Sequence, residues 1–247
     1  MNWNYARYGV RNIENFGEYD LLTYEDKDGV QTLSNRELAD RSNALAASLA
    51  ELGIRRGEVV AVVLPNSLTV PIAFNGIFKS GAVFLPVIFG LTAADIRYIL
   101  QDSGAVAVVT NAELHTKIAA ASEGLKNIRH TIVEGEVPLC PGTISFASFT
   151  DRKVDDFTMA VMEQDEMAVL MYTSGTTGAP KGVMLSHRNV SVTLENGLAS
   201  WPSTREDVSL VPLPLNHIFG MLMVNECNVT GARMIIHKWF DPQLVLE

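Results

Sequence analysis

The sequence predicts an α/β fold with mostly parallel sheets and flanking helices, and two observations support this prediction. Short, nearly continuous apolar runs recur along the chain, and segments with helical periodicity lie between several of them. Apolar runs without alternation are typical of strands that are covered on both faces, as in parallel sheets. Alternation of such strands with helices is typical of the α/β architecture. The predicted strands are residues 59–64, 83–87, 105–109, 131–133, 167–171, 208–211 and 233–236.

The first predicted helix follows Ser34. Ser34 and Glu37 form an S-x-x-E capping box, in which each side chain satisfies a backbone N–H at the helix start. Leu33 and Leu38 flank the cap and are placed for a hydrophobic staple. Gly53 permits the left-handed backbone that ends a helix. One face of this helix is predicted to carry its leucines, Leu38, Leu45, Leu49 and Leu52.

A second helix is predicted to begin after Thr92, which has Asp95 three positions later. It is expected to end near Gly104 and to turn Ile96, Ile99 and Leu100 inward. The polar stretch 135–156 contains prolines and a glycine, so it is predicted to be an irregular connection. We expect any boundary between substructures to fall within 135–165.

Composition and charge narrow the function classes. The chain has 247 residues, with 28 acidic and 19 basic ones, so its net charge is −9. The sequence contains no cluster of basic residues that could follow a phosphate backbone. No nucleic-acid partner is therefore expected. The two cysteines, Cys140 and Cys227, have no paired spacing. Neither a disulfide framework nor a zinc site is therefore predicted.

No membrane span is predicted either. A spanning helix needs about 20 nearly uninterrupted apolar residues. The first residues of the chain lack the charged-then-apolar pattern of a signal peptide. The longest apolar stretch, 208–224, is interrupted by Pro212, Pro214, Asn216 and His217. We therefore expect a soluble, cytoplasmic protein.

The segment that carries the chemistry lies between the apolar runs 167–171 and 183–185. Glycine permits backbone conformations that turn successive N–H groups toward one anion. Hydroxyl groups add donors, Lys181 adds one positive charge, and Pro180 fixes the preceding bend. The segment therefore has the parts needed to hold the phosphates of a nucleotide. It reads Thr173, Ser174, Gly175, Thr176, Thr177, Gly178, Ala179, Pro180, Lys181.

A hairpin loop without a ligand and a P-loop are the two other interpretations of this segment. A glycine-containing hairpin loop without a ligand would explain an isolated Gly-x-x-Gly, but not four hydroxyl residues and a Pro-Lys pair within nine positions. A P-loop NTPase needs Gly-Lys followed by Ser or Thr at the start of a helix. Here Lys181 follows Pro180, and the next residues are predicted to form a strand.

The segment resembles the phosphate-loop signature of the AMP-binding superfamily of adenylate-forming enzymes, which holds acyl-CoA synthetases, luciferases and peptide-synthetase adenylation domains. Residues 33–66, 79–87 and 212–220 are similar to further segments of that superfamily, so the resemblance covers nearly all of the chain from about Thr23. Two departures, at residues 88–90 and at Asn216, affect the expected acyl specificity and leave ATP use untouched.

The resemblance implies a two-step reaction. A carboxylate is joined to the α-phosphorus of ATP with release of pyrophosphate, and a thiol, usually that of coenzyme A, then displaces AMP. ATP, Mg²⁺ and coenzyme A are the implied cofactors and co-substrates, and a fatty or similar apolar acid is the expected substrate. The residues expected to bind the phosphates are Thr173, Ser174, Gly175, Thr176, Thr177, Gly178 and Lys181.

His217 is the second candidate site residue, because an imidazole among apolar neighbours could bind the substrate carboxylate or gate the acyl pocket. A lone histidine in an apolar stretch is more often structural, and the resemblance at Pro214, His217 and Gly220 favours function. The other histidines, His115, His130, His187 and His237, are expected to be surface or packing residues.

The resemblance also implies parts that follow Glu247 in relatives: an adenine- and ribose-binding half, an acidic magnesium ligand and a C-terminal domain with a catalytic lysine. We expect residues 1–247 to be part of an N-terminal domain without turnover of its own. A homodimer through exposed apolar surface is expected, with Met221, Leu222 and Met223 as candidates. Two alternatives stay open: an adenylation domain that loads a carrier protein, and a nucleotide-binding module without catalysis.

Overall fold

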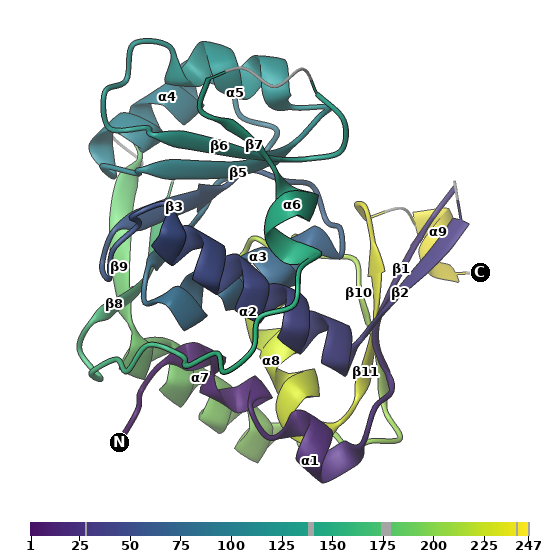
Figure 1. Cartoon of the computed structure of the whole chain (residues 1–247). Coiled ribbons are helices and arrows are strands. Elements are labelled where there is room, and N and C mark those ends of the chain that lie inside the picture. Colours follow the sequence, from purple (N-terminus) through teal and green to yellow (C-terminus); the bar gives the residue numbers. More distant parts are fainter. Residues whose placement is uncertain (28, 138–140, 174–178, 241, 247) are drawn as a thin grey trace.

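Two β-sheets with helices between and around them make up the computed structural model of the chain (Figure 1). It describes residues 1–27, 29–137, 141–173, 179–240 and 242–246. The larger sheet has the strand order β7-β6-β5-β3-β4-β8-β9 and is parallel except for the last pair. The predicted α/β fold with mostly parallel strands is therefore confirmed. These strands are β3 (Val59–Val62), β4 (Val83–Pro86), β5 (Ala107–Asn111), β6 (His130–Glu134), β7 (Thr143–Ser145), β8 (Met167–Thr173) and β9 (Lys181–Ser186).

The smaller sheet has the order β10-β11-β1-β2, with β11 parallel to both of its neighbours and β1 antiparallel to β2. Its strands are β1 (Asp20–Asp26), β2 (Gly29–Ser34), β10 (Val208–Val211) and β11 (Arg233–His237). The helices are η1 (a 3-10 helix, Tyr5–Gly9), α1 (Asn12–Phe16), α2 (Asn35–Glu51), α3 (Thr69–Ser80), α4 (Ala93–Asp102), α5 (His115–Ser122), α6 (Phe146–Thr150), α7 (His187–Ser200), α8 (Ile218–Thr230) and α9 (Pro242–Leu246).

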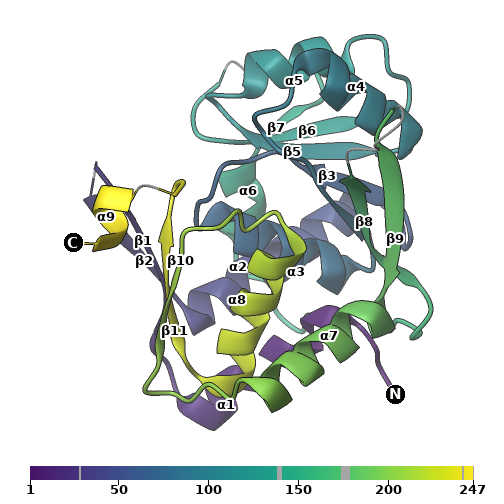
Figure 2. The same cartoon turned by 180° about the vertical axis from the view of Figure 1, so that it is seen from behind.

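Strand β3 shows why the central strands are continuous apolar runs. Its side chains alternate between two cores: Val60 and Val62 pack in the core that includes α2 and α3, whereas Ala61 packs in the core that includes α4 and α5. All three side chains are fully buried. Because helices cover both faces of the sheet (Figures 1 and 2), both faces of the strand must be apolar.

The helix ends follow the predicted local chemistry. Ser34 accepts a hydrogen bond from the backbone N–H of Glu37, and the Glu37 carboxylate accepts one from the N–H of Ser34, so the capping box of α2 is confirmed. Gly53 has φ +74°, the left-handed conformation expected after this helix. Thr92 likewise accepts from the N–H of Asp95 at the start of α4. Ile96, Ile99 and Leu100 are buried, as predicted.

The prediction that every apolar run is covered on both faces is wrong for β10. This strand lies at the edge of the smaller sheet, and Val208 and Leu210 are 47% and 40% exposed. Strands β1 and β2 were not predicted, because only part of each is buried and neither has a continuous apolar run. The stretch 135–156 contains β7 and α6, and it connects β6 to β8 within one sheet.

The expectation that residues 221–223 provide exposed apolar surface is also wrong for Met221, which is fully buried. Leu222 and Met223 are half-buried against the main core. Helix α8 contacts η1, α7 and β11, so it is covered on several sides (Figure 2). No helix of the described segments is long and apolar enough to cross a membrane.

Candidate functional site

The predicted phosphate loop connects two paired antiparallel strands. Strand β8 ends at Thr173 and β9 begins at Lys181, and these two residues are register partners. The predicted strands on both sides of the segment are therefore confirmed, and Lys181 opens a strand rather than a helix. Thr173 and Lys181 are both exposed. The other predicted phosphate-binding residues, Ser174, Gly175, Thr176, Thr177 and Gly178, lie outside the described residues.

Two tyrosine hydroxyls join the stems of this hairpin to α4. Tyr172, next to the end of β8, donates to a carboxylate oxygen of Asp102 at 2.6 Å. Tyr98 donates to the backbone carbonyl of Pro180 at 3.3 Å. Tyr98 and Asp102 are four residues apart, so they share one face of α4. Burial and the bond to Asp102 raise the pKa of Tyr172, so its hydroxyl stays a donor at neutral pH.

The hairpin emerges at the carboxyl edge of the parallel strands. Phe84 of β4 pairs with Val169 of the parallel strand β8, so both strands run toward the same edge. Val87 follows the end of β4 and Tyr172 lies near the end of β8, each three residues beyond that pair. Ligands of open α/β sheets bind beyond the carboxyl ends of the strands. The ends of β8 and β9 that flank the predicted phosphate loop therefore lie where this architecture offers a binding site.

The segment before α8 reaches the same edge through two asparagines that sequence reasoning did not assign to the site. Asn216 is buried, and its amide donates to the backbone carbonyls of Leu64 and Val87 at 3.2 and 3.1 Å. These carbonyls follow β3 and β4. Asn66 accepts from the backbone N–H of Leu215 at 2.7 Å and donates to the carbonyls of Leu213 and His237 at 2.9 and 3.0 Å.

These bonds give Asn216 a structural role. The sequence predicts that Asn216 affects acyl specificity, and in the structure its amide satisfies two strand-end carbonyls. Asn66 could have been noticed as a polar residue directly after a predicted buried strand. The partners of Asn66 could not have been predicted from the sequence, because they are far away in the chain. Leu215, for example, is 149 residues from Asn66.

His217 is exposed and is the N-cap of α8. Its ring accepts from the backbone N–H of Phe219 at 3.4 Å. The turn before it packs closely against the helix, since a Cβ on Gly220 would lie 2.5 Å from the Cα of Leu215 and 2.6 Å from the carbonyl of Pro214. Only glycine fits there. The structure therefore places His217 at the sheet edge that also carries the hairpin, with its imidazole open to solvent.

In the described part of this edge, Lys181 is an exposed cation, whereas Lys117 donates to the carbonyls of Phe89 and Leu91. None of the ion pairs found among the described residues involves Lys181. Within the same residues, no group of three or more His, Cys, Asp or Glu side chains could hold a metal ion. Asp102, the carboxylate joined to the hairpin, accepts from Tyr172. Backbone N–H groups, hydroxyls and Lys181 are thus the groups that could meet an anion here.

The histidines without a predicted site role differ in their surroundings. His187 and His237 are buried packing residues, and His115 and His130 are half-buried. The backbone N–H of Tyr5 donates to Nδ1 of His187 at 3.1 Å. Burial lowers the pKa of His187 to about 4, so it is neutral at physiological pH.

Comparisons with known proteins identify the family of the chain. The family model of AMP-binding enzymes matches residues 10–247. Tyrocidine synthase 2 from Brevibacillus parabrevis is 36% identical over 178 residues, which cover 72% of this chain and 4% of that protein. The long-chain-fatty-acid–CoA ligase from Yersinia pestis is 32% identical over 242 residues, which cover 85% of this chain and 43% of that protein.

A solved structure shares the fold over almost the whole chain. The crystal structure of a long-chain-fatty-acid–CoA ligase from Archaeoglobus fulgidus matches with a TM-score of 0.88 and 23% identity. The match covers 98% of this chain and 48% of that one. The chain therefore spans less than half the length of each of these three proteins.

Proposed function

The chain belongs to the AMP-binding enzyme family, and on that premise we propose that its parent protein is an acid–thiol ligase. The ligase joins an apolar carboxylic acid first to the AMP part of ATP and then to coenzyme A. We propose a fatty acid as this substrate. In the first step a carboxylate oxygen bonds to the α-phosphorus and pyrophosphate leaves. In the second the thiol sulfur bonds to the acyl carbon, AMP leaves with the bonding electron pair, and the thiol proton is released.

The observation that carries this proposal is the hairpin at the carboxyl edge, where Thr173 and Lys181 close a glycine- and hydroxyl-rich loop. We assign Thr173, Ser174, Gly175, Thr176, Thr177 and Gly178 to the β- and γ-phosphates. Lys181 neutralises part of their charge, and it contributes most when charge builds on the leaving pyrophosphate. Tyr172 and Tyr98 hold the two stems of the loop in place through α4.

His217 is assigned to the acid substrate. Its imidazole is exposed at the same edge as the hairpin and can donate to a carboxylate oxygen through Nε2, while Nδ1 accepts from the N–H of Phe219. Phe219 and Leu213, next to it, are 46% and 47% exposed. These side chains offer apolar surface to the remainder of the acid. This arrangement supports an apolar acid.

ATP carries Mg²⁺ in this proposal, and the ion would neutralise phosphate charge when bound. The described residues of the carboxyl edge supply no set of carboxylates for it. The function of this chain's own residues is therefore to hold and orient phosphate oxygens and the acid. No step is assigned to a magnesium ligand of this chain.

Isotope exchange between pyrophosphate and ATP, measured on the parent protein, tests the proposal. Exchange should require the acid and should proceed without coenzyme A, because the adenylate forms before the thiol reacts. Thioester should appear only when coenzyme A is added. Absence of acid-dependent exchange would leave the chain as a nucleotide-binding module and would refute the ligase assignment.

A second candidate differs only in the thiol. The 36% identity to tyrocidine synthase 2 favours an adenylation domain that loads a carrier protein. Both candidates predict acid-dependent exchange, so the acceptor decides between them. Transfer of radiolabelled acid to coenzyme A supports the first candidate. Transfer only to the phosphopantetheine thiol of a carrier protein supports the second.

A further inference from the structure

A cavity lies at the edge of the larger sheet opposite to the carboxyl edge. Helix α3 leaves the carboxyl end of β3 and returns to the amino end of β4, so its last turn, with Lys79, lies at the amino edge. Beside this turn is a cavity of about 490 Å³ between the N-terminal segment, α2, α3 and residues 157–161. Small-molecule sites commonly have volumes of about 300–1,000 Å³.

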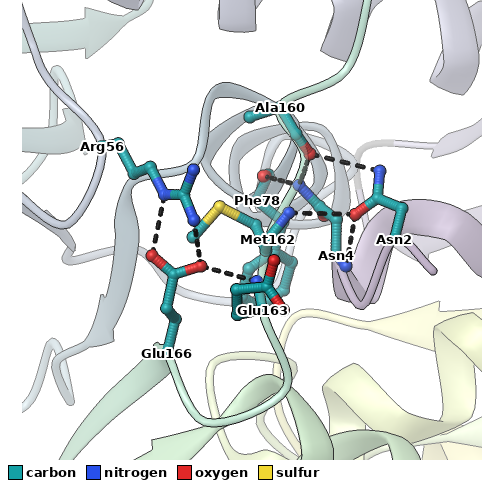
Figure 3. Close-up of polar contacts among 8 residues, drawn as sticks. All are labelled: Asn2, Asn4, Arg56, Phe78, Ala160, Met162, Glu163 and Glu166. Atoms are coloured by element: carbon teal, nitrogen blue, oxygen red, sulfur yellow. Dashed lines mark hydrogen bonds and ion pairs between the residues drawn. The ribbon is translucent and has the colours of Figure 1, made fainter.

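Hydrogen bonds hold the walls of this cavity together (Figure 3). The Asn4 amide donates to the backbone carbonyls of Phe78 and Ala160 at 2.5 and 3.1 Å. The backbone N–H of Ala160 donates to the carbonyl of Lys79 at 2.9 Å, and that of Met162 donates to the Asn2 side chain at 3.1 Å. The N-terminal segment and residues 157–161 are therefore tied to the end of α3, so the cavity is formed without a ligand.

Lys79 is the only ionisable side chain among the described residues that line the cavity. Its ammonium donates to the carbonyl of Ala39 at 3.1 Å, and to Ser42 Oγ and the Asn43 side-chain oxygen, both at 2.7 Å. All three acceptors are neutral. No described carboxylate forms an ion pair with Lys79.

The charge of Lys79 is therefore poorly compensated. Burial lowers the pKa of Lys79 to about 7, and only the field of the exposed Asp40 acts in the opposite direction. Charged groups on neighbouring elements have partners elsewhere: Arg7 pairs with Glu195, and Arg41 pairs with Asp151. Residues 157–161 contain no charged side chain. An anion in the cavity would stabilise the ammonium form.

We propose that this cavity binds a small apolar monocarboxylate, whose negative charge pairs with the Lys79 ammonium. Apolar side chains provide the remaining wall, with Val10, Ile13, Leu38, Met159 and Val161 as its members. A carboxylate oxygen of the ligand replaces the Asn43 side-chain oxygen as an acceptor of the Lys79 ammonium. Among the described residues, the hydrogen bond from Lys79 is the one that the Asn43 side chain forms. The site is separate from the nucleotide site, and it does not depend on the proposed ligase activity.

Calorimetric titration of the 247-residue chain with sodium octanoate tests this site. Octanoate should bind at pH 6, and octan-1-ol, which lacks the charge, should bind at least tenfold more weakly. Since the free Lys79 has a pKa of about 7, raising the pH from 6 to 8 should weaken octanoate binding by about tenfold. Binding at pH 8 should also take up nearly one proton per octanoate, which is measured from the dependence of the enthalpy on the buffer.

Variants separate this site from others. Lys79→Met should lower the affinity for octanoate at least tenfold, and Val10→Trp, at an exposed position of the cavity wall, should block entry without disturbing the buried amine. Lys117→Met is the matched control, because Lys117 also donates to two backbone carbonyls, those of Phe89 and Leu91. It should leave binding unchanged.

Three outcomes would overturn the proposal: no detectable octanoate binding at pH 6, equal affinity for octanoate and octan-1-ol, or binding that survives Lys79→Met. Octanoate binding that is lost in His217→Ala and kept in both cavity variants would place the ligand at the carboxyl edge instead. All measurements omit ATP, so they succeed or fail independently of the proposed ligase.

Discussion

Two basic side chains at one edge of the larger sheet and two at the other lie in opposite surroundings. At the carboxyl edge, Lys181 and His217 are exposed. At the amino edge, His187 is buried without any exposed surface, and Lys79 lies against a cavity with neutral partners. Burial lowers the pKa of Lys79 to about 7 and that of His187 to about 4. Lys181 and His217 are thus hydrated, whereas His187 and Lys79 are largely shielded from water.

The difference follows from how each group is positioned. Lys181 opens β9 and is exposed, so its ammonium is hydrated. Lys79 is in the last turn of α3, which packs closely against α2, and the amine replaces water with three protein acceptors. A hydrated ammonium must lose water when it binds, so it favours a ligand with several negative charges. A desolvated ammonium has already lost its water, so a single negative charge is enough to stabilise its charged form.

The largest expected effect compares the two lysines in pyrophosphate exchange by the parent protein. Lys181→Ala should slow exchange by about 30- to 1,000-fold, corresponding to about 2–4 kcal/mol of lost stabilisation of the leaving phosphates. Lys79→Met should change the rate less than about threefold, because Lys79 lies at the other edge. Equal effects of the two substitutions would mean that the edges do not have separate functions. An unchanged rate for Lys181→Ala would refute the phosphate-loop assignment.

The second effect concerns acid stability and His187. Its folded pKa of about 4 lies below the ordinary value of 6.5. A group with a lowered folded pKa contributes stability above the unfolded pKa, and that stability is lost as the pH falls from about 6.5 to 4. The loss should be about 2–4 kcal/mol in the free energy of unfolding.

His187→Gln provides the matched comparison, because glutamine keeps an acceptor for the backbone N–H of Tyr5 and does not titrate. Urea unfolding of both proteins at several pH values between 4 and 7 should show a smaller loss of stability in the variant. The difference isolates His187 from carboxylates that also titrate in this range. Parallel pH dependences would contradict the burial of this imidazole.

The comparison also shows which features could be predicted from the sequence. Strands β3, β4, β5, β6 and β8 of the larger sheet and the capping box at Ser34 depend on residues close together in the chain, so local patterns predicted them. Strand β7 was missed, because it lies in the stretch that was predicted to be irregular. The glycine- and hydroxyl-rich segment before Lys181 was recognisable because its chemistry is continuous in sequence. Strand β1 was missed because its burial depends on β11, more than 200 residues away.

The positions of the functional side chains depended on packing that no local pattern records. Asn66 and Asn216 hold the His217 turn through contacts between residues 149 and 152 positions apart. Lys79 was identified only as part of a family segment, because its desolvation arises from α2 and from residues 157–161. Sequence reasoning therefore predicted the candidate phosphate-binding segment and left the amino-edge cavity unnoticed.

The third effect separates the two basic residues of the carboxyl edge. His217→Ala in the parent should raise KM for the acid by about tenfold, or about 1.4 kcal/mol, while KM for ATP changes less than about twofold. Lys181→Ala should act mainly through ATP. Exchange rates measured while each substrate is varied alone distinguish these patterns. A loss of thermal stability in His217→Ala with unchanged kinetics would show that the imidazole acts only as the cap of α8.

The smallest effect tests whether α4 positions the hairpin. Tyr172→Phe removes the 2.6 Å hydrogen bond to Asp102. Asp102 is exposed, so water replaces the lost donor, and the cost should be about 1 kcal/mol in the free energy of unfolding. Tyr98→Phe, which removes the 3.3 Å bond to Pro180, is the matched control and should cost less, since that bond is longer and Tyr98 is 37% exposed. Urea unfolding measures the loss of stability in both variants, and the dependence of the unfolding free energy on urea concentration should not change.

Amide exchange near residues 179–182 should quicken more in Tyr172→Phe than in Tyr98→Phe. The reverse order would mean that α4 holds the hairpin through Pro180 instead.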